Sequence, residues 1–132
     1  MLVTVLIAHD CLENFIGPSK TWRADPALSG GGHLMDTGSH IVDMLLYISG
    51  LDPEEVYASI NNHGALVDAV SALTLRFRSG ARGTLDATIL SMEPWREEFS
   101  FYGTKGVLNI RDGQITEAAY CSAQSGATER AG

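Results

Sequence analysis

The stretch from Ser29 to Gly50 constrains the fold more than any other part of the sequence, because its side chains repeat with the period of an α-helix. Its apolar residues recur seven, four and three positions apart, and these are Leu34, Ile41, Leu45 and Ile48. Ser29 is a suitable N-cap, and a glycine such as Gly50 commonly ends a helix. We therefore expect one long, mostly buried helix from Ser29 to Gly50.

The opposite face of this helix carries a narrow row of polar side chains. The row comprises His33, Asp36, His40, Asp43 and Tyr47, spaced three and four residues apart. At about 100° per residue, it covers only ~80° of the circumference. Buried charges are costly unless they are paired or used. We therefore predict that this row lines the functional site, the alternative being a polar helix face directed to water.

The rest of the sequence is typical of β-strands. Some segments are rich in aliphatic and β-branched residues, and in others apolar and polar residues alternate or flank a tight turn. The predicted strands are 2–8, 55–60, 73–78, 82–89, 99–102, 107–110 and 114–120. The predicted fold class is α+β, a largely antiparallel open-faced sheet with one long helix packed on one face. The helix is expected to cover Leu73, Leu75, Phe77, Leu85 and Ile89. We expect a single domain over residues 1–121 and a flexible tail over residues 122–132.

The charge of the chain bears on the partners it can bind. Nine Lys and Arg against sixteen Asp and Glu give a net charge of −7. This balance argues against nucleic acid and against an anionic membrane surface, since both need a basic face. No apolar run approaches the ~20 residues that cross a bilayer. Cys11 and Cys121 are too few for a disulfide framework, so we expect a cytoplasmic protein with idle thiols.

Asp36 and His40 are the candidate catalytic residues, because a spacing of four places both side chains within reach of one ligand. A histidine can transfer a proton near neutral pH, and a carboxylate can orient it or bind a substrate hydroxyl. His33, Asp36, His40 and Asp43 could also ligate a metal, but no metal-binding motif supports this use, and we predict no metal site.

Glycines occupy positions 30 to 32, where they allow either the close approach of a backbone or ligand, or a flexible hinge. Their spacing differs from that of the glycine-rich loops that bind phosphates. No G-x-G-x-x-G motif or P-loop occurs in the sequence. We therefore expect no cofactor-binding residues within this chain.

The segment from Trp22 to Asp43 has the pattern W-R-x-D-P-x-x-x-G-G-G-x-x-x-D-x-G-x-H-x-x-D. With this pattern, the hairpin 73–85 and Tyr102-Gly-Thr-Lys-Gly-Val-Leu108, the chain resembles the C-terminal domain of the Gfo/Idh/MocA oxidoreductases over most of residues 1–115. The resemblance implies that Asp36 holds a substrate hydroxyl and that His40 acts as an acid/base. The candidate substrate-binding residues around them are Trp22, Arg23, Gly31, Gly32, His33 and Asp43.

Members of this family place a Rossmann domain ahead of the C-terminal domain, with a glycine-rich loop and a catalytic lysine in a Glu-Lys-Pro motif. Neither motif occurs in this sequence. The resemblance therefore implies NAD or NADP for the full-length family, and only half of a site here. It also implies a homodimer formed through the open sheet face.

These expectations combine into one predicted function. The chain is expected to be the substrate-binding and oligomerisation domain of an NAD(P)-dependent oxidoreductase that acts on a sugar or cyclitol hydroxyl, without activity on its own. The alternative is a stand-alone, non-catalytic α+β module that binds a small polyol or serves dimerisation.

Overall fold

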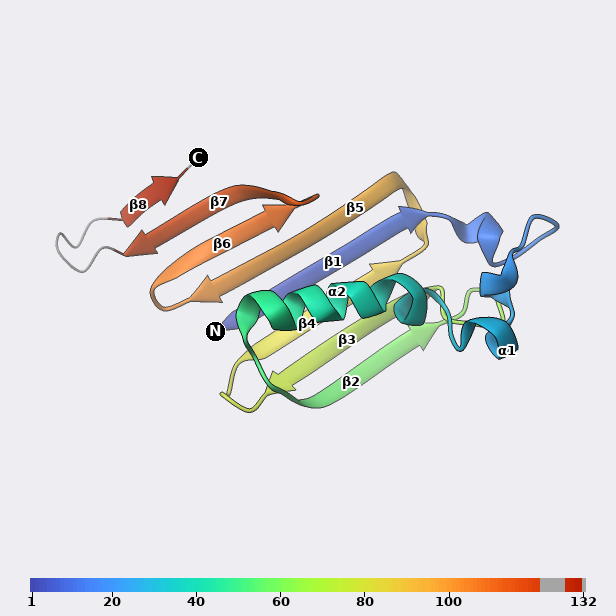
Figure 1. Ribbon diagram of the computed structural model, residues 1–132, viewed down its shortest axis with the longest axis horizontal. Coiled ribbons are helices and arrows are strands. Elements are labelled where there is room, and N and C mark those ends of the chain that lie inside the picture. Colours follow the sequence, from blue (N-terminus) through green and yellow to red (C-terminus); the bar gives the residue numbers. More distant parts are fainter. Residues whose placement is uncertain (122–127, 132) are drawn as a thin grey trace.

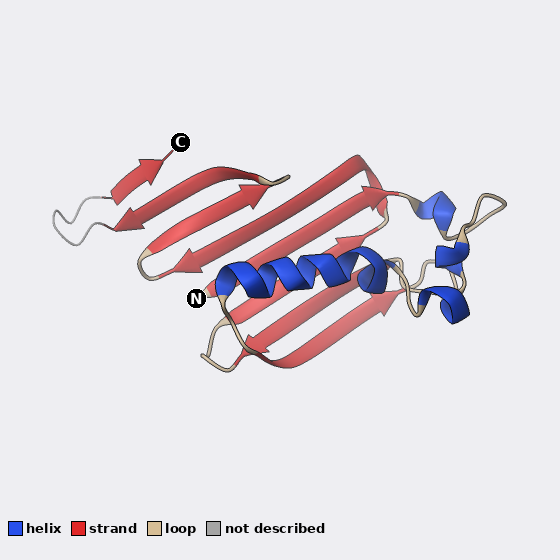
Figure 2. Ribbon diagram, viewed as in Figure 1, coloured by secondary structure: helices blue, strands red, loops and turns tan. Residues whose placement is uncertain are grey.

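The computed structural model describes residues 1–121 and 128–131, which form one sheet with a long helix lying across it (Figures 1 and 2). The strands are β1 (Leu2–Asp10), β2 (Pro53–Asn61), β3 (Val70–Phe77), β4 (Arg82–Thr88), β5 (Leu90–Gly103), β6 (Gly106–Arg111), β7 (Gln114–Cys121) and β8 (Thr128–Ala131). The helices are α1 (Pro26–Ser29) and α2 (His33–Ser49), preceded by the 3-10 turns η1 (Leu12–Asn14) and η2 (Trp22–Ala24).

The sheet has the strand order β2-β3-β4-β1-β5-β6-β7-β8. Strand β1 runs parallel to β4, and every other neighbouring pair is antiparallel. A parallel pair requires a long crossover, and here the connection from β1 to β4 contains α2 and the hairpin of β2 and β3. The predicted α+β class, with a largely antiparallel sheet and one long helix, is confirmed.

The main core joins α2 to the centre of the sheet. Ile41 and Leu45 of α2 share one buried cluster with side chains of β1, β3, β4 and β5, among them Val3, Val5, Ile7, Phe77, Leu85, Phe99 and Phe101. Phe77 and Leu85, which were expected under the helix, share this cluster with Ile41 and Leu45, and Leu73 and Leu75 are partly buried against it. Burying these apolar side chains is the main source of stability for such a layer.

The prediction for Ile89 is wrong. This residue follows the end of β4 and belongs to a second cluster with Phe15, Val67 and Ala69. Its amide donates to the carbonyl of Ala69, and its carbonyl accepts from the amide of Cys11. The loops after β1 and β2 therefore cover Ile89, rather than the long helix.

The start of the long helix also differs from the prediction. The chain forms the short helix α1 first, and Gly30 ends it in the left-handed region with φ of 75°. Ser29 is consequently the last residue of α1 and not the N-cap of α2, which begins after Gly32. The helix is also less buried than expected, since Met35 and Ile48 are exposed together with Tyr47.

Strand β5 begins earlier than the alternation pattern indicates, and it contains Pro94. His9 of β1 pairs with Trp95 and Asp10 pairs with Leu90, so four residues of β5 lie outside the regular ladder. Proline is tolerated at such a bulge because no ladder hydrogen bond is required of it.

In the predicted tail, residues 122–127 and 132 lie outside the described residues. Thr128–Ala131 form the short strand β8 on the edge of β7. Within the described part of the chain, none of the helices has the length and apolar content needed to cross a membrane.

Candidate functional site

The first turn of α2 is held by a residue far away in the sequence, Asp68. One carboxylate oxygen accepts from the amide of Gly32 at 2.8 Å, and the other accepts from the amide of Leu34 at 2.7 Å. The carbonyl of Asp68 accepts from the amide of His33 at 3.2 Å. Gly32 has no side chain to cap the helix, so Asp68 satisfies amides that would otherwise lack partners and places a negative charge at the positive end of the helix.

This arrangement explains the glycine at position 32. A Cβ added to Gly32 would lie 2.4 Å from the carbonyl oxygen of Asp68, and one added to Gly31 would lie 2.8 Å from the Cβ of Met35. Of the two interpretations of the glycine run, close approach of a backbone therefore holds for Gly32. That backbone is the chain's own loop before β3.

Three of the predicted site residues come together beside this turn. The Nε of Arg23 donates to Asp36 at 2.8 Å, and its guanidinium lies 4.6 Å from the ring centroid of Trp22. About one third of the Asp36 side chain remains exposed. Its second oxygen forms no hydrogen bond with a described residue. A carboxylate fixed on one side and open on the other can accept a hydrogen bond from a ligand hydroxyl.

Two buried imidazoles lie under the same turn. His33 is 2% exposed, and its ring contacts the ring of His9 edge to face, with centroids 5.0 Å apart. His9, at the end of β1, lies in turn against Trp95 of β5, with ring centroids 3.9 Å apart. The Nε2 atoms of both histidines have no hydrogen-bond partner among the described residues.

Burial controls the protonation of this pair. It lowers the pKa of His33 to about 4, with a further contribution from the neighbouring His9, while Asp68 and Asp36 act in the opposite direction. Burial likewise lowers the pKa of His9, and the charge of Asp36 opposes this shift. Both rings are consequently neutral near pH 7.

The later turns of α2 have a different environment. His40 and Asp43 are exposed, and 87% of the Tyr47 surface is accessible. The burial expected for the whole polar row is therefore wrong for these three residues, whose side chains are accessible to solvent. The reason is that Ile41 and Leu45 direct their side of the helix into the core. Asp36 and His40 still project from adjacent turns, as their spacing requires.

Sequence reasoning missed Asp68, His9 and Trp95. A helix that starts after glycines, with no polar N-cap side chain, is a signal that a distant acceptor caps it, but the signal does not identify Asp68. His9 and Trp95 have no local signal at all, because their contacts depend on how β1, β5 and α2 pack. Cys11 is a poor nucleophile, since burial together with Asp10 and Asp36 raises the pKa of its thiol.

The start of α2 has no free amides for a phosphate at residues 32–34. Phosphates bind to such amides at a helix start, but Asp68 already accepts from those of Gly32 and Leu34. In residues 1–121 and 128–131, no cluster of three or more His, Cys, Asp or Glu side chains is arranged to hold a metal ion.

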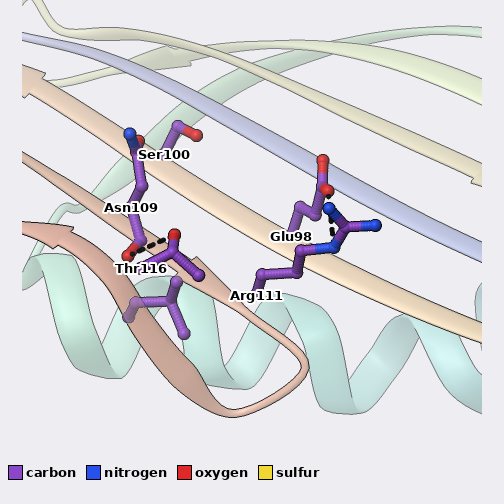
Figure 3. Close-up of a pocket in the computed structure, with 6 residues that line it drawn as sticks. Glu98, Ser100, Asn109, Arg111 and Thr116 are labelled. Carbon is purple, nitrogen blue, oxygen red and sulfur yellow. Dashed lines mark hydrogen bonds and ion pairs between the residues drawn. The ribbon is translucent and has the colours of Figure 1, made fainter.

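A polar hollow of about 250 Å³ lies on the other side of the sheet (Figure 3). Glu98 and Ser100 line it, and they alternate along β5 with the core residues Phe99 and Phe101, so they point away from α2. Arg111 pairs with Glu98 at 3.3 Å inside the hollow. None of the predicted site residues lines it.

Comparison with known proteins gives a consistent result. A family model described as the GFO/IDH/MocA C-terminal domain matches residues 2–109. Myo-inositol 2-dehydrogenase from Thermotoga maritima is 32% identical over 93 residues, which cover 62% of this chain and 27% of that protein.

Solved structures share the fold. Levoglucosan dehydrogenase in complex with NADH and L-sorbose superposes with a TM-score of 0.84 at 22% identity, covering 99% of this chain and 38% of that one. The WlbA dehydrogenase from Bordetella pertussis, in complex with NADH and UDP-GlcNAcA, has a TM-score of 0.75 at 22% identity, covering 94% and 39%. The chain thus spans about a quarter of the curated relative and under two fifths of these structures.

Proposed function

The chain belongs to the GFO/IDH/MocA oxidoreductase family, and from this premise we propose that it is the substrate-binding domain of an NAD(P)-dependent oxidoreductase that acts on a hydroxyl of a sugar or cyclitol. The observation that carries the proposal is the Arg23–Asp36 pair beside an exposed His40. The names of the relatives, which include myo-inositol and levoglucosan dehydrogenases, support a polyhydroxylated substrate.

In this proposal Asp36 binds the reacting hydroxyl. Arg23 fixes the orientation of the carboxylate through one oxygen, and the second oxygen accepts a hydrogen bond from the substrate O–H. His40, one turn further along α2, takes the hydroxyl proton on an imidazole nitrogen during oxidation and returns it during reduction. The guanidinium of Arg23 also lies over the ring of Trp22, which helps to hold it in place.

The dinucleotide would supply the hydride acceptor when bound. Because Asp68 occupies the amides at the start of α2, we assign the binding of its phosphates to a separate domain. The exposure of His40 and Asp43 supports this arrangement, because a reactive imidazole directed to solvent is available to a second domain that covers the site. His33 and the three glycines then support the substrate site from below, and Asp43 extends its polar surface along the helix.

The test is a pair of variants in the protein that joins this chain to its dinucleotide-binding domain. His40→Ala should lower kcat by about 10²- to 10⁴-fold with sugars or cyclitols, while the affinity for NAD(P) changes little. Asp36→Asn should raise KM as well as lower kcat. Unaltered turnover in His40→Ala would remove this residue from the mechanism.

The stand-alone binding module is the alternative function. It would bind polyols without any turnover, and Asp36→Ala would remove the rise in melting temperature that polyols cause. Turnover in the presence of a dinucleotide-binding domain separates the two functions.

We further propose a homodimer formed through the sheet face opposite α2. This face carries a polar hollow and the ion pairs that Glu98 forms with Arg96 and Arg111. Such polar groups are hydrated in a monomer and can form hydrogen bonds and ion pairs with a second subunit. Measurement of the solution mass by light scattering tests it, and Ser100→Arg in the hollow should shift a dimer toward monomer.

A further inference from the structure

Trp95 lies on the same side of the sheet as the candidate site. His9 follows Val3, Val5 and Ile7 in alternation along β1, and these three belong to the core under α2. Trp95 is the cross-strand partner of His9 and therefore shares its side. A bulge begins directly beyond this pair, where the register of β1 and β5 shifts.

The indole of Trp95 contacts a buried ring, yet the residue stays half exposed. Its ring lies 3.9 Å from the buried ring of His9, which is 7% exposed, and His9 in turn contacts His33. Half of the Trp95 surface nevertheless remains accessible. An exposed aromatic ring backed by buried rings costs little conformational entropy when it binds a ligand, because it is already held in place.

The contacts lead from this ring to the catalytic carboxylate. His33, at the end of the row formed by Trp95, His9 and His33, lies three residues before Asp36, and thus on the same side of α2. Side chains three residues apart on a helix are neighbours on its surface, so the Asp36 carboxylate follows the ring of His33 along α2. A ligand held by Asp36 therefore has an apolar, electron-rich surface nearby.

This combination fits one chemical class of ligand. The face of an indole carries negative electrostatic potential, and it attracts the C–H groups that a cyclic polyol or sugar ring presents on its flat side. Pockets for such ligands combine an apolar surface with a few polar groups that fix the orientation. An acyclic polyol presents no comparable flat face, because its chain rotates freely.

We propose that Trp95 is a specificity-determining residue of the substrate site, which stacks on the C–H face of a six-membered polyol or sugar ring whose hydroxyl is bound by Asp36. This inference rests on the proposed function and deepens it, because it restricts the substrates to cyclic ones. His9 acts as a positioning residue that holds the indole in place.

The experiment is an NMR titration of the full 132-residue chain with myo-inositol and, separately, with the acyclic polyol D-glucitol. The indole N–H signal of Trp95, assigned by its loss in Trp95→Phe, should shift with myo-inositol and stay in place with D-glucitol. Trp95→Ala should weaken myo-inositol binding about tenfold, and Trp95→Phe, which keeps an aromatic face, no more than about threefold. Met92→Ala is the matched control, since it alters a fully exposed side chain of the same bulge.

The outcomes separate the two proposals. If Trp95→Ala binds myo-inositol as well as the unaltered chain while Asp36→Asn loses binding, the role of Trp95 is overturned and the proposed function stands. If neither polyol binds the unaltered chain, both proposals are overturned for these ligands. Once the indole signal is assigned, its shift in the unaltered chain is a readout that does not depend on the folding of Trp95→Ala.

Discussion

The first turn of α2 and its later turns carry similar polar residues in very different surroundings. In the first turn, Asp68 occupies the main-chain amides, His33 is buried, and Asp36 is paired with Arg23. In the later turns, His40 and Asp43 are exposed and bond to no described side chain. Helical periodicity fixes the angle of a residue about the axis, but it does not fix how deeply each turn is covered along the axis. The burial of the first turn depends instead on the loops and strand ends that cover it.

The difference has an energetic consequence. A change in the first turn breaks contacts between parts of the chain that are distant in sequence, so it should cost stability. A change at the exposed residues His40 or Asp43 of the later turns breaks no contact of this kind, so it should leave stability nearly unchanged. The predictions below compare the two regions directly.

Gly32→Ala should have the largest effect. The new Cβ would lie 2.4 Å from the backbone of Asp68, which cannot move without loss of the helix cap. We expect a loss of about 3 kcal/mol in the free energy of unfolding. Gly103→Ala is the control, because its Cβ would meet its nearest neighbour at an ordinary 3.5 Å. Chemical denaturation of both variants measures the difference, and equal stabilities would contradict the close approach.

The pH dependence of stability should come next. The unfolded chain protonates His33 below about pH 6.5, whereas burial holds the pKa of the folded His33 at about 4. Since the unfolded state then binds more protons, stability is highest above pH 6.5 and falls as the pH decreases toward 4, by on the order of 2 kcal/mol. Denaturation curves between pH 4 and 7 should show this slope. His33→Leu should flatten it, and His40→Gln in the exposed region should not.

The sequence predicted the parts of this molecule that depend on local periodicity. The alternation in β3 and β4 and the burial of Ile41 and Leu45 follow from side-chain spacing alone. The parallel pairing of β1 with β4 does not, since it joins segments separated by the whole crossover. The same applies to the site: the pattern W-R-x-D-P-x-x-x-G-G-G-x-x-x-D contains both Arg23 and Asp36, but only the structure shows that their side chains form an ion pair. Asp68 and Trp95 reach the site from other loops and strands, where no spacing rule links them to α2.

Asp68→Asn should have a smaller effect than either change above. An asparagine keeps one acceptor oxygen, but it loses the second acceptor and the negative charge at the helix start. We expect a loss of about 1 kcal/mol in the free energy of unfolding. The matched control is Asp43→Asn on the later turns, which should stay within about 0.5 kcal/mol of the unaltered chain. Equal effects in the two variants would show that the first turn is not specially held.

His40→Ala should change stability least and thereby sharpen the contrast with His33. Its side chain is exposed and bonds to no described residue, so its removal leaves no cavity and no unpaired group. The melting temperature should therefore stay within about 2 °C of the unaltered chain. A large drop would mean that His40 supports the fold, and the loss of turnover expected for this variant could then no longer be assigned to proton transfer. An unchanged melting temperature together with lost turnover would place its role in the chemistry.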